Sequence, residues 1–261
     1  MQRTRVIVFS VIVACFAIPP VSANEHALFD QVLRAHVRDG FVDYPAIQMD
    51  ERFQAYIDYL ETADPDSLAT RDEQLAFWIN AYNALAIKGV LDGLSTGSFV
   101  SRVNFFTVDY SLAGRQIDLY DLEHDVIIPF GEPRIHFAIV CASASCPKLI
   151  SEAYLAATLD QQLERNTRAF INNESENRFD KTWKTARISK IFDWFADDFV
   201  AHSTTVQRYM AQYVDDAEIA GALRNDEYQI WFLGYDWSVN GVAPQVPAGN
   251  AEMVNARSER R

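Results

Sequence analysis

The chain has 261 residues, 49% of them hydrophobic and 13% aromatic, so it can bury one substantial core, and this length fits one domain better than two. Its formal net charge is −13 at pH 7. A surface this acidic repels phosphate backbones and anionic lipids, which argues against nucleic-acid and membrane-surface partners.

The first 23 residues predict an export signal. A basic start, MQRTR, precedes an apolar stretch at Val6–Ile18, and Val21–Ala23 supplies the small residues of a cleavage site. The apolar stretch is short for a membrane span, and Pro19 and Pro20 interrupt it. We therefore expect cleavage after Ala23 and an exported protein, periplasmic or secreted, with no integral membrane span.

A lipoprotein is the alternative interpretation of the same segment. Ile12–Cys15 has the form of a lipoprotein box in which Cys15 would be acylated. The apolar residues Phe16–Val21 that would follow are unlike the start of a mature lipoprotein, which favours simple cleavage. Cleavage after Ala23 removes two arginines and no acidic residue, so the net charge of −13 becomes −15.

Helical patterns account for most of the chain before residue 92. Apolar spacing predicts helices over His26–Arg38 and Arg52–Leu60, separated by a short extended link at Phe41–Pro45. The segment Thr70–Glu73 reads as a capping box, so a third helix should start there. Its body, Leu75–Leu91, is apolar almost all round, as in a helix buried at the centre of a core.

Two asparagines, Asn80 and Asn83, interrupt this apolar helix one turn apart. A buried carboxamide needs partners for its donors and its acceptor, or it costs free energy. In a structural interpretation they hold neighbouring loops in place. In a functional interpretation one of them orients a catalytic histidine or binds a substrate carbonyl.

A β-hairpin and a further helix are expected next. Phe105–Tyr110 and Gln116–Leu119 read as the two strands of the hairpin. Asp118–Ile128 has helical spacing, with acidic residues near its start. Glu123 and His124 lie in its middle; because adjacent helical residues point about 100° apart, the pair does not form a metal chelate by itself.

The stretch Arg134–Pro147 concentrates the reactive side chains. Arg134–Cys141 alternates as a β-strand does, and His136 lies on one face of it. Small residues then favour a close turn that ends at Cys146, and the proline that follows biases this cysteine away from helical geometry. After signal removal Cys141 and Cys146 are the only cysteines, and an oxidising compartment permits their pairing.

The second half of the chain alternates helices and short strands. Three acidic residues, Asp193, Asp197 and Asp198, are interpreted as a solvated helix face because no calcium-binding loop surrounds them. Gly241–Arg261 has no apolar period and is predicted to be a disordered tail. The expected elements are a helix from Ser151 to about Ile171, strand pieces in Arg178–Ile188, a Ser189-capped helix over Lys190–Val200, short helices at Thr204–Val214 and Ala217–Leu223, and a strand at Tyr228–Tyr235.

Together these elements predict an α+β fold: a helix-rich single domain over residues 24–240, with a small, mainly antiparallel sheet packed on the buried central helix. The sheet would contain the hairpin of residues 105–119 and the strands 134–141 and 228–235. Such a sheet would bring Cys146, His136 and the turn at Asp236 to neighbouring ends.

With these segments laid out, the chain resembles the family catalogued as domain of unknown function 547. The resemblance rests on six short blocks in the same order: Asp43-Tyr44, LAFWINAYNAL at 75–85, LEH at 122–124, RIHFAIVCASASCP at 134–147, SKIFDWFADDF at 189–199 and YDWSVN at 235–240. It implies a mixed helix-and-sheet domain, found in exported bacterial proteins and in longer eukaryotic proteins. It implies no activity.

One hypothesis for the function is a thiol-dependent hydrolase or transferase. Such chemistry needs a thiolate, a histidine that acts as its base and a polar group that orients the ring. The nucleophile candidate is Cys146. The base candidate is His136, with His124 second, and the candidates for orienting the ring are Glu123, Asn80 and Asp236.

The alternative is a non-catalytic binding or interaction domain for a small molecule or a peptide. In it Cys141 and Cys146 form a disulfide that closes the loop, and His136 is a packed core residue. A metal-dependent hydrolase built on the histidines and carboxylates is disfavoured because no HExxH or similar ligand spacing is present, and we expect no cofactor.

Overall fold

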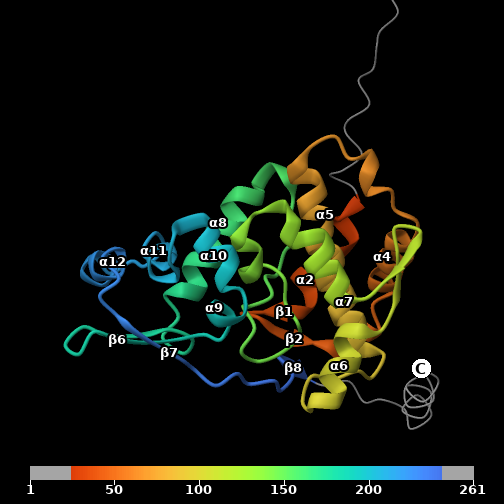
Figure 1. The fold of residues 1–261 in the computed structure, drawn as a ribbon. Helices are drawn as coiled ribbons and strands as arrows, with labels where there is room; N and C mark the ends of the chain where they lie inside the picture. Colours follow the sequence, from red (N-terminus) through yellow and green to blue (C-terminus); the bar gives the residue numbers. More distant parts are fainter. Residues whose placement is uncertain (1–24, 243–261) are drawn as a thin grey trace, which may run out of the picture.

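Helix α5 (Arg71–Leu91) lies among α2 (Ala27–His36), α4 (Glu51–Thr62) and α7 (Leu119–Asp121) in one half of the computed structural model, which describes residues 25–242 (Figure 1). Its predicted capping box is confirmed, since the Glu73 N–H donates to Thr70 Oγ1 and the Thr70 N–H donates to the Glu73 carboxylate. All side chains from Leu75 to Ile87 are buried. The predicted export signal, the Cys15 alternative and the tail beyond Val242 lie outside the described residues.

A first hydrophobic core surrounds α5. The elements that build it are α2 (Ala27–His36), β1 (Val37–Arg38), β2 (Phe41–Asp43), α3 (Tyr44–Gln48), α4 (Glu51–Thr62), a 3₁₀ turn at Pro65–Ser67, α6 (Phe99–Thr107), β3 (Tyr110–Leu112), β4 (Arg115–Ile117) and α7 (Leu119–Asp121). A π-helical turn at Leu122–Ile127 and a 3₁₀ turn at Ile128–Phe130 extend α7.

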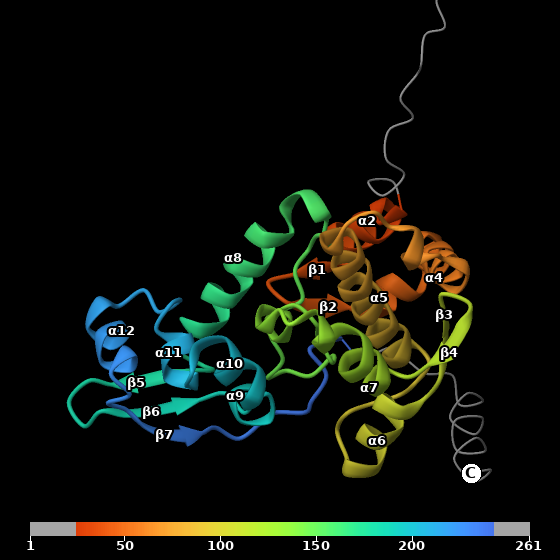
Figure 2. The same cartoon turned by 45° about the horizontal axis from the view of Figure 1, so that its top comes forward.

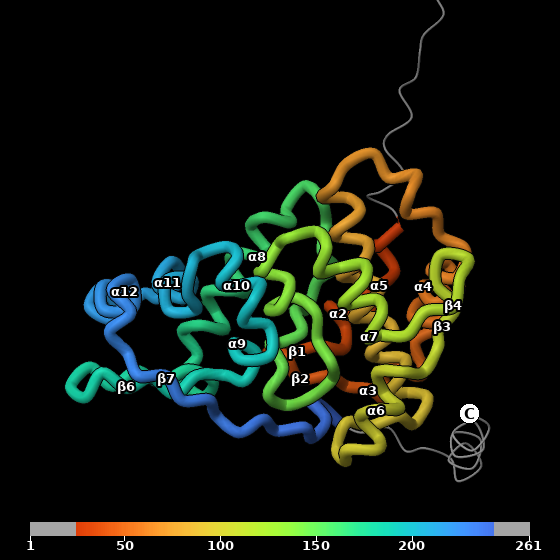
Figure 3. Tube along the Cα trace, viewed as in Figure 1, coloured from red at the N-terminus to blue at the C-terminus, as the bar shows by residue number. Residues whose placement is uncertain are grey.

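A second core lies beside the first and is built by the later part of the chain (Figures 1 and 3). Helix α8 joins the cores, because Leu159 and Leu163 pack in the first and Phe170 and Ile171 in the second (Figure 2). The elements of this second core are α8 (Leu159–Ile171), β5 (Arg178–Asp180), β6 (Thr185–Ile188), α9 (Ile191–Trp194), α10 (Ala196–Ser203), α11 (Val206–Met210), α12 (Ala217–Arg224) and β7 (Gln229–Phe232). The last strand, β8 (Gly241–Val242), lies with the first core.

After β7 the chain runs back beneath the first core, so residues 233–240 connect the two halves of the molecule (Figure 1). There β8 pairs in parallel with β2, two residues beyond the predicted end of the folded part. Asn240 fixes this return, since the Tyr44 hydroxyl donates to its Oδ1 at 2.6 Å and the Val42 N–H donates to its carbonyl.

The predicted α+β class and the buried central helix are confirmed, but the single sheet is wrong. Within residues 25–242 the strands form three small sheets: β1-β2-β8, the hairpin β3-β4, and β5-β6-β7. Three of the five pairings are antiparallel. The hairpin is shorter than predicted because Ser98 caps α6, which runs to Thr107 and includes the first three residues of the predicted strand Phe105–Tyr110.

The predicted strand Arg134–Cys141 is not formed. Pro133–Phe137 is a 3₁₀ turn in which the Glu132 carboxylate accepts from the Arg134 N–H, and the following residues run without a neighbouring strand. Their backbone is satisfied by Asn83 instead, which donates to the Ala138 carbonyl at 3.0 Å and accepts from the Val140 N–H at 2.8 Å. The alternation of apolar residues was misleading because both faces of this segment are buried.

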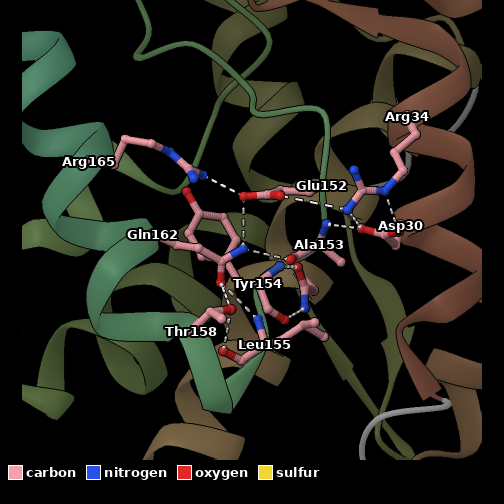
Figure 4. Close-up of polar contacts among 10 residues, drawn as sticks. Asp30, Arg34, Glu152, Ala153, Tyr154, Leu155, Thr158, Gln162 and Arg165 are labelled. Atoms are coloured by element: carbon pink, nitrogen blue, oxygen red, sulfur yellow. Dashed lines mark hydrogen bonds and ion pairs between the residues drawn. The ribbon is translucent and has the colours of Figure 1, made fainter.

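The predicted helix from Ser151 begins later, with a 3₁₀ turn at Ala156–Thr158. The preceding backbone is held by side chains from three elements (Figure 4). Asn80 accepts from the Tyr154 N–H and donates to its carbonyl, Gln162 binds Leu155 and Ala153 in the same way, and Asp30 accepts from the Ala153 N–H. Both asparagines of α5 therefore hold neighbouring segments in place.

The replacement Asn83→Ala should lower the free energy of unfolding by about 3 kcal/mol, because each buried backbone group left without a partner costs about 1–3 kcal/mol. Urea unfolding at pH 7 measures the change. Gln54→Ala is the matched control, since it removes a carboxamide from the exposed side of α4. If both variants lose the same small amount, the hydrogen bonds of Asn83 do not stabilise the fold.

Candidate active site

A cavity of about 170 Å³ lies where the two cores and the returning segment meet. The first core supplies Tyr82 from α5 and Glu123 and His124 from the π-helical turn, and α9 supplies Ile191 and Trp194 from the second. The remaining lining residues come from the segments between the elements and from α6 and α7: Phe106, Tyr120, His136, Ile139, Cys141, Cys146, Pro147, Phe195, Tyr235 and Trp237.

The two cysteines lie on one wall of this cavity. Their sulfur atoms are within disulfide-bonding distance, and their Cα atoms are 6.4 Å apart. The Tyr235 hydroxyl donates to Cys146 Sγ at 3.1 Å and lies 3.5 Å from Cys141 Sγ, and the Cys141 N–H is 3.2 Å from Cys146 Sγ. The cysteine pair therefore shares one hydroxyl group, supplied by the returning segment.

The loop between the cysteines is held by the same returning segment. The Ala144 N–H donates to the Ser238 carbonyl at 2.7 Å, and the Ser145 N–H donates to the Asp236 carbonyl at 3.1 Å. Ala142 has a φ of +61°, a left-handed conformation that a small residue tolerates better than a bulky one. The small residues of this turn thus let the backbone close tightly.

Glu123 is buried in the cavity wall, with 7% of its surface exposed. The pKa of Glu123 is raised to about 7, mainly by burial; the hydrogen bond from Tyr82 opposes this rise, and the charge of Asp198 adds to it. The Tyr82 hydroxyl donates to Glu123 Oε2 at 3.2 Å. At neutral pH this carboxyl group therefore exchanges a proton readily, as an acid–base catalyst must.

His136 is a fully buried part of the cavity wall and stacks on Phe195, with ring centroids 3.9 Å apart. Its Nε2 lies 2.7 Å from Asp198 Oδ2, whereas Nδ1 is buried and has no partner among the described residues. Burial lowers the pKa of His136, although Asp198 opposes this effect. An ionised Asp198 requires the proton on Nε2, which leaves the lone pair on Nδ1.

His124 is only partly buried. Its ring stacks on Tyr120 at 3.9 Å, and its Nδ1 lies 2.9 Å from the Tyr120 carbonyl. Because a carbonyl accepts, Nδ1 carries a proton and Nε2 is the acceptor of the neutral ring. Within residues 25–242, neither histidine makes a hydrogen bond to a cysteine sulfur.

Four of the six predicted site residues line this cavity: Cys146, His136, Glu123 and His124. Asn80 does not, because it binds the backbone of Tyr154. Asp236 does not either, because it is exposed and accepts from the Ser238 N–H.

The sequence-based prediction missed Tyr82, Tyr235 and Asp198. Asp198 was assigned to a solvated face, yet it binds His136. A helical signal could have revealed it, since it lies three residues after Phe195, which stacks on the same ring. The tyrosines gave no such signal, because their roles depend on contacts over 41 and 89 residues of chain.

The described residues contain no group of three or more histidine, cysteine, aspartate or glutamate side chains arranged to hold a metal ion. In the same part of the chain, no helix is both long and apolar enough to cross a bilayer.

Buried Glu123 should make stability depend on pH. Its folded pKa of about 7 lies above the unfolded value of 4.5, so unfolding releases a proton and the ionised group costs stability as the pH rises from about 5 to 8. Glu123→Gln should remove this cost and gain about 2 kcal/mol relative to wild type over that range. Urea unfolding of wild type and Glu123→Gln at about pH 5 and about pH 8 tests this. If the free energy of unfolding changes equally with pH in the two proteins, Glu123 has an ordinary carboxyl pKa.

No curated protein and no solved structure matches the chain. Residues 65–171 match the profile of the family described as "Protein of unknown function, DUF547", so this part of the chain is similar to that family. The matched residues contain α5, Glu123, both cavity histidines and both cysteines.

Proposed function

We propose that the chain is a thiol-dependent hydrolase or transferase in which Cys146 is the nucleophile. The observation that supports this most strongly is the convergence of Cys146, Glu123 and two histidines on one cavity. The enzyme would act with both cysteines reduced, because a disulfide blocks the nucleophile. Export to the periplasm or the extracellular space belongs to the same proposal, since there the pair can also be oxidised.

Two hydrogen-bond donors stabilise the sulfur of Cys146 as a thiolate. They are the Tyr235 hydroxyl at 3.1 Å and the Cys141 N–H at 3.2 Å. Donors aimed at an anion favour its charged form, which is the nucleophilic form of a thiol. Tyr235 itself stays protonated, because burial raises its pKa well above the usual range.

Glu123 is the proton carrier in this proposal, since its pKa of about 7 lets it accept and return a proton at neutral pH. It takes the proton of Cys146, the sulfur bonds to an acyl carbon of the substrate, and the bond to the leaving group breaks as that group takes up the proton. Water or a second nucleophile then gives a proton to Glu123 and attacks the thioester, the carbon–sulfur bond breaks, and the sulfur takes the proton back as the free thiol. His136, ordered by Asp198, is the second candidate base.

The alternative function is a non-catalytic binding domain, and one observation favours it: the sulfur atoms of Cys141 and Cys146 lie within bonding distance. A permanent disulfide would close the loop on the cavity and leave a rigid binding site. The redox state of the pair therefore separates the two functions.

The mass of the intact protein, measured with and without reductant, reports the redox state. We expect a difference of two hydrogen atoms that returns after reoxidation, as for a reversible pair. A bond that resists dithiothreitol in the folded protein, and reduces only after unfolding, would support the permanent disulfide and the binding domain.

Alkylation by iodoacetamide tests the thiolate. In reduced protein at pH 7, we expect Cys146 to react about tenfold faster than the same cysteine in the unfolded chain, because its anion is stabilised. Tyr235→Phe should slow the reaction several-fold. Tyr120→Phe is the control, since that tyrosine lines the same cavity without a hydrogen bond to sulfur. Equal rates in folded and unfolded protein would refute an activated nucleophile.

A further inference from the structure

The walls of the cavity are mainly aromatic. Three of the rings form a cluster, with centroids 4.8 Å apart for Trp194 and Tyr235, 5.5 Å for Trp194 and Trp237, and 4.4 Å for Tyr235 and Trp237. Phe195 and Tyr82 extend this surface. The face of an aromatic ring is electrically negative and attracts cations when water is excluded.

The charge of the lining has one sign. Among the residues that line the cavity, Glu123 is the only carboxylate, and none is a lysine or an arginine. Asp198 lies close enough for its charge to raise the pKa of Glu123. His136 does not offset this charge, because burial keeps its ring neutral. An anion entering this cavity would meet negative charge without a permanent cationic partner, whereas a cation would neutralise a buried carboxylate.

One ring of the cluster already binds a cation. The Arg102 guanidinium lies 4.4 Å from the ring centroid of Trp237. Arg102 does not line the cavity, so the internal surfaces of the cluster remain available. The volume of about 170 Å³ gives room for a small organic molecule.

We propose that this cavity selects a small organic cation, whose ammonium group lies between Glu123 and the rings of Trp194, Tyr235 and Trp237. The part of this proposal that makes the cation a substrate rests on the proposed function, because it assigns the bound cation to the reaction of Cys146. The selectivity itself depends only on the cavity and holds with or without catalysis. Neither the family match nor the sequence indicates this ligand class.

Calorimetric titration of the reduced protein with tetramethylammonium and choline tests the cation, and 3,3-dimethylbutanol, which replaces the nitrogen of choline with carbon, is the neutral comparison. We expect choline to bind about tenfold more tightly than the alcohol. Glu123→Gln should remove this preference. Glu61→Gln makes the same charge change at an exposed site outside the cavity and should leave the preference for choline over the alcohol unchanged.

Trp194→Leu is the second variant, because Trp194 is 45% exposed and its loss disturbs the core less than a change at Glu123. It should weaken choline binding by about tenfold. Equal affinities for choline and the alcohol, or no binding of either cation at about 20 mM, would overturn the inference.

Cys146→Ser separates this inference from the proposed function. Selective choline binding by this variant, together with slow alkylation of the wild type, would refute the nucleophile and support the cation site. Fast alkylation of Cys146 without any preference for cations would support the nucleophile and refute the cation site.

Discussion

The structure depends on hydrogen bonds between two buried carboxamides of α5 and chain segments that have no strand partner. Asn83 binds the Ala138 carbonyl and the Val140 N–H. Asn80 binds the N–H and the carbonyl of Tyr154. A backbone buried without hydrogen bonds is costly, so these contacts allow irregular chain to cross the core beside an apolar helix. The segment held by Asn83 leads directly to Cys141, which lines the cavity.

The cavity exists because three parts of the chain meet beside that segment. The π-helical turn brings Glu123 to the cavity, α9 and the adjacent Phe195 supply further lining residues, and Tyr235 and Trp237 complete the site on return from β7. A π-helical turn widens the helix locally and is often found at functional sites. None of these three parts forms the cavity alone, so an intact second core is a condition for the site.

The contacts of Cys146 suit either redox state, which is why the structure accommodates both candidate functions. A hydroxyl and an amide N–H at its sulfur stabilise a thiolate, and a neighbouring sulfur at bonding distance permits a disulfide. The carboxylate of the cavity opposes formation of the thiolate, because an ionised Glu123 disfavours a second anion nearby. A bound cation would relieve this repulsion, which links ligand chemistry to the reactivity of the thiol.

The sequence by itself determined the elements whose signals are local: the capping box at Thr70, the apolar helix α5, and most of the short helices and strands of the second half. The single helix predicted over Lys190–Val200 is instead two helices, α9 and α10, separated at Phe195. The sequence also singled out Cys146, His136, Glu123 and His124, which the structure brings to one cavity. It misassigned residues 134–141, because alternation of apolar residues describes a strand only when a neighbouring strand is present. The partner of this segment is a side chain of α5.

Only the tertiary structure decided that Asp198 orders His136, that Tyr235 reaches both sulfur atoms, and that Asn80 and Asp236 stand apart from the cavity. Burial set the pKa of Glu123, and burial is a property of the packed cores and not of the local sequence. These features join residues that are far apart along the chain, and local patterns carry no information about which distant segments pack together.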